Sequence, residues 1–270
     1  MSVLIISLII SFFLGAALAS FVHCWANRLY SGVGFKKRSH CPRCRHKLSW
    51  FHNIPIFSYL GLGGKCAYCH KPIAKSYLVS EIVGGLALLL AFVVIWQKLG
   101  GESGFWLALD TYRAWFIVGQ AIIGLVLLML IFWSDYWWLS IFTKPILIGA
   151  LILAVLGLLS GRSWFSLLLG AVVGGLFFAV QFWLSKGRWV GEGDIYLGLL
   201  LGVWLGWPVI CLTILFAYLL GSIVGLSLLA LKRKDWSAKL PLGVFLAPSG
   251  WLFFLCGQQL WQQYIHWLGW

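Results

Sequence analysis

Long apolar runs separated by short polar segments constrain this chain more than any other feature. Each run is long enough, or nearly so, to cross the ~30 Å hydrocarbon core of a bilayer as a helix. The runs lie at residues 3–26, 78–97, 114–134, 145–160, 163–185, 195–207, 209–231 and 243–265. With 61% hydrophobic and 10% charged residues, the chain has too little polar sequence to cover a soluble globule. The sequence predicts an all-α polytopic membrane protein with about eight transmembrane helices.

Basic residues predict the orientation of these helices. Segment 27–77 holds ten of the twenty Lys and Arg residues and no acid, so the positive-inside rule places it in the cytoplasm. Counting spans from there places Asp135 and Asp194 at the same, cytoplasmic side. The net charge of +13 is then explained by orientation and by anionic lipid headgroups rather than by nucleic acid. The first run lacks a basic start and a small-residue cleavage site, so we expect a retained span.

Two CxxC pairs lie in the basic segment. Cys41 and Cys44 form one pair, and Cys66 and Cys69 form the other after 21 intervening residues. This spacing is typical of a tetrahedral four-thiolate Zn²⁺ site, and a full set of ligands indicates a structural role. We therefore predict three parts: a first transmembrane helix (1–26), a zinc-binding cytoplasmic loop domain (27–77) and a transmembrane domain (78–270).

Acidic residues are rare in this chain, so each one is a candidate for a specific structural or catalytic role. The chain has seven, and Asp135 and Asp194 lie at the ends of apolar runs without a basic residue at helical i+3 or i+4 spacing. Two carboxylates brought together at one membrane face share a proton and activate water, which indicates an aspartyl protease. We expect Glu192 to be a solvated loop acid. Glu81 is expected either to form a buried ion pair or to contribute to a methyl-transfer site.

Several stretches of the chain resemble the type IV prepilin peptidases, a family of GxGD aspartyl proteases. They are residues 14–21 with 27–29, residues 41–50, 53–60 and 64–69 closing on Tyr77 and Glu81, Gly191-Glu-Gly193-Asp194, and residues 240–245. The sequence departs from the family pattern at two places. The family usually has a proline a few residues after its first catalytic aspartate, whereas this chain has Ser140 and Ile141 at that place after Asp135. Tyr196 stands where the family often has a lysine two residues after the second aspartate.

The resemblance implies an activity and a location. Asp135 and Asp194 would be the catalytic pair of an endopeptidase that removes the leader of type IV prepilins or pilin-like proteins of type II secretion systems. Family members with the cysteine loop commonly also N-methylate the new amino terminus with S-adenosylmethionine. No residue for this cofactor is identified, because no Gly-rich nucleotide-binding loop is visible. The implied location is the bacterial inner membrane, with the active site toward the cytoplasm.

Three other functions remain open at this point. A membrane thiol-redox protein would use its CxxC pairs, although it would not need a second pair at zinc spacing. A proton-coupled transporter would use Asp135 and Asp194 as proton carriers. A presenilin-like intramembrane protease shares GxGD but lacks the cysteine loop.

Overall fold

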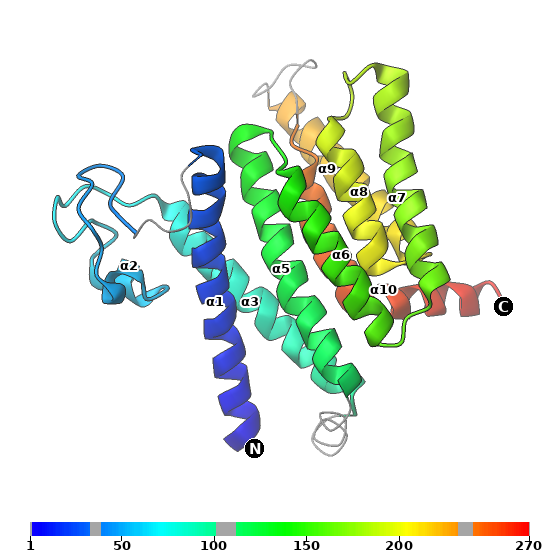
Figure 1. Cartoon of the computed structure of the whole chain (residues 1–270), viewed down its shortest axis with the longest axis horizontal. Coiled ribbons are helices and arrows are strands. Elements are labelled where there is room, and N and C mark those ends of the chain that lie inside the picture. The colour runs from blue at the N-terminus through cyan, green and yellow to red at the C-terminus, as the bar shows by residue number, and fades with distance from the viewer. Residues whose placement is uncertain (1, 33–38, 101–111, 232–239, 270) are drawn as a thin grey trace. The chain divides into compact units, whose positions relative to one another are not determined.

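The chain is almost wholly helical where it is described. The structure is a computed structural model that describes residues 2–32, 39–100, 112–231 and 240–269. The helices are α1 (Ser2–Tyr30), the 3-10 helix η1 (Trp50–Asn53), α2 (Phe57–Gly61), α3 (Lys75–Lys98), α5 (Tyr112–Trp138), α6 (Thr143–Leu159), α7 (Trp164–Ser185), α8 (Glu192–Leu205), α9 (Val209–Ala230) and α10 (Gly243–Trp267) (Figure 1). Each predicted apolar run is a helix. Within the described ranges the only β pairing consists of two isolated bridges.

The predicted membrane character is confirmed. By length and composition, α1, α3, α5, α7 and α9 are long and apolar enough to cross a membrane, and α6 is a shorter apolar helix. The chain is a multi-pass membrane protein. It forms two compact units, Met1–Glu102 and Ser103–Trp270. The predicted three parts, with a boundary between residues 77 and 78, stay a prediction.

In the first unit, α1 and α3 pack closely along their lengths. Glycines allow this approach: a Cβ at Gly15 would collide with the Gly84 carbonyl, and one at Gly85 would lie 2.7 Å from the Phe12 ring. The cysteine loop lies between the two helices in sequence. Its short helix α2 contacts α1 through stacked rings of Phe13 and Phe57, whose centroids are 5.6 Å apart.

In the second unit, α8 lies against α6 and α7 and also contacts α9 and α10 (Figure 1). Glycines of α7 and α8 face each other: a Cβ at Gly198 would collide with the Gly174 carbonyl, and one at Gly202 with that of Gly170. Small residues of this kind let two helix backbones approach closely in a membrane. The buried side chain of Trp204 fills the space left by Gly124 of α5. This packing fixes the helix that carries Asp194.

Two helix boundaries differ from the prediction near the aspartates. α5 continues to Trp138 instead of ending near 134, because Tyr136, Trp137 and Trp138 extend its apolar sequence. α8 begins at Glu192 instead of 195, since acidic residues in a first turn are favourable to the helix dipole. Both Asp135 and Asp194 are therefore helical residues.

Candidate active site and metal centre

Asp135 lies in the last turn of α5 with only 6% of its surface exposed. Its carboxylate is held by another helix, because the Gly243 amide at the start of α10 donates to Asp135 Oδ2 at 2.6 Å. The Val244 amide interacts with the same carboxylate. The first amides of a helix have no partner within that helix, so they are free to bind an anion. Gly243 and Val244 belong to the 240–245 stretch, to which the sequence alone assigned no role.

Asp194 lies in the first turn of α8 and is 8% exposed. Its Oδ2 accepts a hydrogen bond of 2.9 Å from the Gly191 amide, which caps the helix. Gly193 lies against the loop after α5, since a Cβ there would be 2.7 Å from Ile141 Cβ. At Gly191 a Cβ could be accommodated, because the nearest atom would lie 3.6 Å from it, an ordinary van der Waals distance. Close approach is therefore required at Gly193 alone.

The two aspartates act on each other. The negative charge of Asp135 reaches Asp194, so the carboxylates lie within electrostatic range. In the described part of the chain, backbone amides and the other aspartate act on them, and no Lys or Arg does. Tyr196 does not take the place of a cation, because its hydroxyl donates to Glu192 Oε1 at 3.3 Å. Two nearly buried carboxylates without a cation are suited to sharing one proton.

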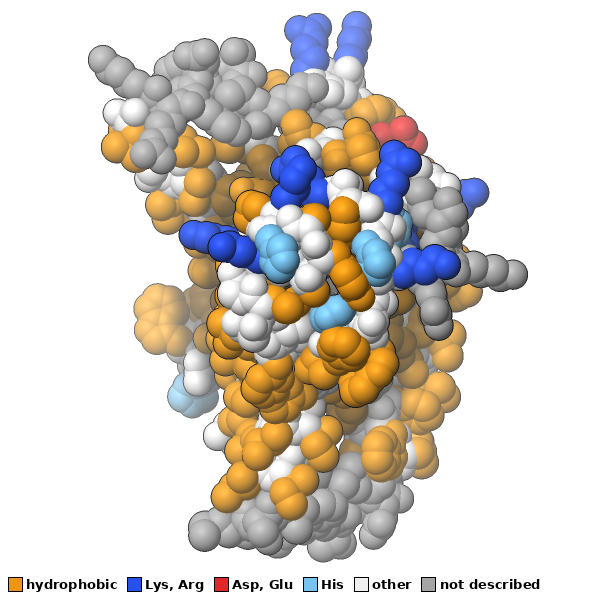
Figure 2. Space-filling model, turned by 90° about the vertical axis from the view of Figure 1, so that its left-hand side faces the viewer, with side chains coloured by type: hydrophobic (Ala, Val, Ile, Leu, Met, Phe, Trp, Pro, Cys, Tyr) orange, Lys and Arg blue, Asp and Glu red, His pale blue; other side chains and the backbone are white. Residues whose placement is uncertain are grey.

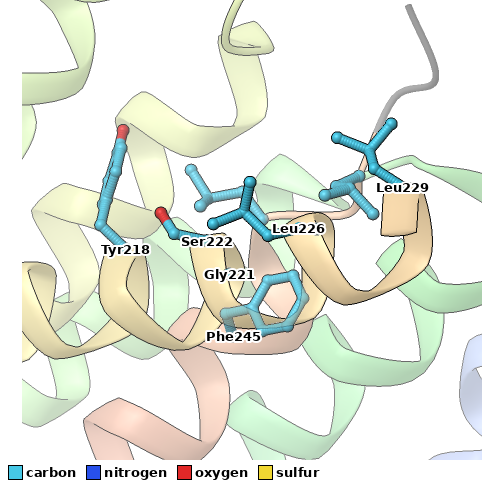
Figure 3. Close-up of a pocket in the computed structure, with 9 residues that line it drawn as sticks. Tyr218, Gly221, Ser222, Leu226, Leu229 and Phe245 are labelled. Atoms are coloured by element: carbon cyan, nitrogen blue, oxygen red, sulfur yellow. The ribbon is translucent and has the colours of Figure 1, made fainter. Parts of the chain in front are cut away.

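A groove of about 400 Å³ lies between α9 and the start of α10. Figure 3 shows Tyr218, Ser222 and Leu226 projecting from one side of α9, with Phe245 of α10 close by. The Tyr218 hydroxyl donates to Gln181 Oε1 at 2.9 Å, and Tyr218 lies within electrostatic range of Asp194. The groove is mostly apolar, and neither aspartate lines it. It adjoins the pair through Tyr218 and through Leu242, the residue before Gly243. Sequence reasoning missed it, because it depends on how two helices pack.

The four predicted cysteines form one cluster. The Sγ atoms of Cys41, Cys44, Cys66 and Cys69 all lie within 4.8 Å of one another. A tetrahedral Zn²⁺ with Zn–S bonds of about 2.3 Å would separate its sulfurs by about 3.8 Å. The distance from Cys41 Sγ to Cys69 Sγ is 3.9 Å. The donor set therefore fits a four-thiolate metal site.

The two CxxC pairs have the same backbone conformation. In each, the residue after the second cysteine has positive φ, 58° at Arg45 and 55° at His70. Its amide donates to the first cysteine's carbonyl, from Arg45 to Cys41 at 2.9 Å and from His70 to Cys66 at 3.0 Å. Both turns thus aim two sulfurs at a common point. The sequence predicted the ligands, whereas this repeated conformation is visible only in the structure.

Backbone amides also prepare one of the four sulfurs, that of Cys66, for metal binding. Those of Cys69 and Tyr68 hydrogen-bond to the Cys66 sulfur and lower the pKa of its thiol to about 7. The thiolate, which is the form that binds metal, is favoured as a result. His40, His46 and His70 flank the pairs and are exposed outside the cluster, as expected. Figure 2 shows Lys, Arg and His side chains gathered on the face around this loop.

Glu81 joins the cysteine loop to the α1–α3 pair. Its Oε2 accepts a hydrogen bond of 2.7 Å from the Ile56 amide, and the Ser20 side chain bonds to the same carboxylate. Ile56 has φ 65° and ψ −55°, and Phe57 N donates to Pro55 O at 2.7 Å, which makes a γ-turn. Such a turn is strained for a β-branched residue. An amide and a hydroxyl therefore bind the Glu81 carboxylate in place of the ion pair considered from the sequence.

Comparison with known proteins identifies the family of this chain. Residues 13–96 match the Bacterial Peptidase A24 N-terminal domain. A prepilin leader peptidase/N-methyltransferase of Pseudomonas aeruginosa is 34% identical, over 86% of this chain and 76% of the relative. Proteins of the same name from Stutzerimonas stutzeri, at 32% identity, and Aeromonas hydrophila, at 31%, align over 86% and 84% of this chain and 76% and 74% of their own lengths. No solved structure matches the chain. This chain therefore belongs to the family of prepilin leader peptidases/N-methyltransferases.

Proposed function

We propose that this chain is a membrane aspartyl endopeptidase that removes the leader of prepilins or pilin-like proteins, with Asp135 and Asp194 as its catalytic pair. The observation that carries the proposal is the pair itself: two nearly buried carboxylates from different helices act on each other without a described cation. One carboxylate takes a proton from water while the other donates one to the peptide carbonyl. The apolar groove lined by Tyr218 is the proposed binding place for the apolar segment of the substrate.

The proposed location is the bacterial inner membrane, with the carboxylates toward the cytoplasm. The excess of Lys and Arg in segment 27–77 supports this orientation, because such residues stay on the cytoplasmic side. A substrate would then present its leader to the cytoplasm and keep its apolar helix in the bilayer.

We further propose that the cysteine cluster holds a structural Zn²⁺. The four sulfurs leave no position for a reactive water, so the metal would hold the loop together instead of taking part in hydrolysis. A metal bound by both CxxC pairs would also explain why the loop keeps its fold although many of its side chains are exposed.

N-methylation of the new amino terminus with S-adenosylmethionine is proposed from the names of the relatives. The described residues do not fit a Gly-rich strand–helix nucleotide site, since they form no sheet. No residue is therefore assigned to the methyl donor.

The test of proteolysis uses the full chain in detergent with a synthetic precursor that has a basic leader, a glycine at the cut and an apolar helix of about 20 residues. We expect Asp135→Asn and Asp194→Asn each to abolish leader release, because a neutral amide cannot exchange the proton. Glu192→Gln, which changes an exposed acid two residues from Asp194, should cleave normally. Cleavage by either Asn variant at the wild-type rate would contradict the assignment.

A further inference from the structure

The amino-terminal end of α10 points two amides at Asp135. The Gly243 hydrogen bond is short at 2.6 Å, and the Val244 amide acts on the same carboxylate. Bonds from N–H groups to a carboxylate are stronger when the acceptor is ionised, and short ones are typical of a charged acceptor. This arrangement therefore favours the negative form of Asp135.

Gly243 is shaped for this contact. A Cβ at this position would lie 2.9 Å from Asp135 Oδ2 and 3.1 Å from Ile131 Cγ2. Either atom would have to move, so the carboxylate lies this close to the start of α10 only because residue 243 has no side chain.

Asp194 is held less firmly. Its hydrogen-bond donor is the Gly191 amide at 2.9 Å, from the turn that begins its own helix. A carboxyl that accepts one amide through Oδ2 still has Oδ1 to carry a proton. The two aspartates thus differ in the number and length of the hydrogen bonds that favour the charged form.

We propose that the start of α10 keeps Asp135 ionised, so that Asp135 is the general base and Asp194 holds the shared proton as the general acid. This assignment rests on the proposed proteolytic function. Gly243 is a positioning residue that acts through Asp135. Both helix dipoles act against this assignment, because Asp135 lies at the carboxyl end of α5 and Asp194 lies in the first turn of α8. A helix dipole nevertheless acts more weakly than amides that point directly at a carboxylate.

The proton movements balance in this scheme. Asp135 takes one proton from water as the water oxygen bonds to the peptide carbon, while Asp194 gives its proton to the carbonyl oxygen. When the C–N bond breaks, Asp135 passes its proton to the leaving nitrogen. Asp194 recovers a proton from a hydroxyl of the intermediate, which restores the starting pair.

The first test is binding of the precursor peptide with a hydroxyethylene unit in place of the cleaved amide. Its hydroxyl donates to an ionised carboxylate and accepts from a protonated one. We expect Asp194→Asn to bind within about threefold of wild type, because the amide N–H₂ replaces the acid as donor. Asp135→Asn should bind more than about tenfold weaker, since a charged acceptor is lost. Equal losses, or the reverse order, would overturn the assignment.

The second test removes the Gly243 amide. Proline has no N–H, whereas alanine keeps the donor and adds the same Cβ. Proline also disfavours the helical conformation of Leu242 before it, which has φ −70° and ψ −35°. Gly243→Pro should have a kcat at least about tenfold below that of Gly243→Ala, with KM within about twofold. Thermal unfolding of both variants checks that they are folded. Equal kcat values, or a difference confined to KM, would reject the role of the amide.

These results are distinguishable from failure of the proposed function. If the chain were not an aspartyl endopeptidase, Asp135→Asn and Asp194→Asn would both still cleave the precursor. If only the assignment of roles were wrong, both variants would lose cleavage while the order of hydroxyethylene binding changed.

Discussion

At the scale of single residues, the two glycines beside Asp194 differ in how closely other residues pack against them. Gly193 touches the loop after α5, where a Cβ would be 2.7 Å from Ile141 Cβ, whereas the nearest atom to a Cβ at Gly191 is 3.6 Å away. In the sequence the two glycines of the GxGD stretch look alike. Only the packing of the 139–142 loop against α8 separates them, and no local pattern encodes it.

We expect Gly193→Ala to lower kcat/KM by on the order of tenfold to a hundredfold, because the added methyl displaces the first turn of α8 and the carboxylate with it. Gly191→Ala is the matched control, and its activity should stay near wild type. The measurement is cleavage of the synthetic precursor by each variant at equal protein concentration. Equal activity of the two variants would show that the contact with Ile141 does not position Asp194.

At the scale of helices, α8 is fixed at its far end by Arg162. The guanidinium donates to the carbonyl oxygens of Trp204 and Leu205, the latter at 3.3 Å. The last carbonyls of a helix have no partner within it, so the half-buried Arg162 cation stabilises that end. Arg162 thus connects the loop between α6 and α7 to the helix that carries Asp194.

Arg162→Ala should lower the free energy of unfolding by about 2 kcal/mol, because it leaves buried carbonyls without a charged donor. Thermal unfolding in detergent measures this loss. Arg113→Ala, which removes an exposed arginine, serves as the control and should unfold like wild type. A normal melting temperature for Arg162→Ala would mean that water replaces the guanidinium at this helix end.

The sequence predicted where the helices lie along the chain better than it predicted which helices contact one another. Apolar length identifies each run as a helix, and CxxC spacing identifies the cysteine ligands, since both signals are local. The pairing of α7 with α8 depends instead on Gly170, Gly174, Gly198 and Gly202, which repeat at four-residue spacing and could have been recognised as a packing pattern. The contact of Gly243 with Asp135 joins residues 108 positions apart, so no local signal contains it.

At the scale of the whole molecule, the cysteine cluster and the aspartate pair belong to separate compact units. Loss of the metal should therefore affect the loop without removing either carboxylate. Cys41→Ser should lower the bound zinc measured by elemental analysis from about one ion per chain, because a four-thiolate site loses a ligand. Cys256→Ser, a change in α10 outside the cluster, should keep full metal content. Full metal content in Cys41→Ser would contradict the ligand assignment.

The central claim is that Asp135 and Asp194 work as one unit, and comparison of the single and double Asn variants tests it most directly. Residues that share one proton are not additive, so removing either one removes the function of both. We predict that Asp135→Asn, Asp194→Asn and the double variant all lose precursor cleavage to the same residual level, on the order of a thousandfold or more below wild type. Losses that multiply in the double variant, or a single variant that keeps most of its activity, would contradict the account.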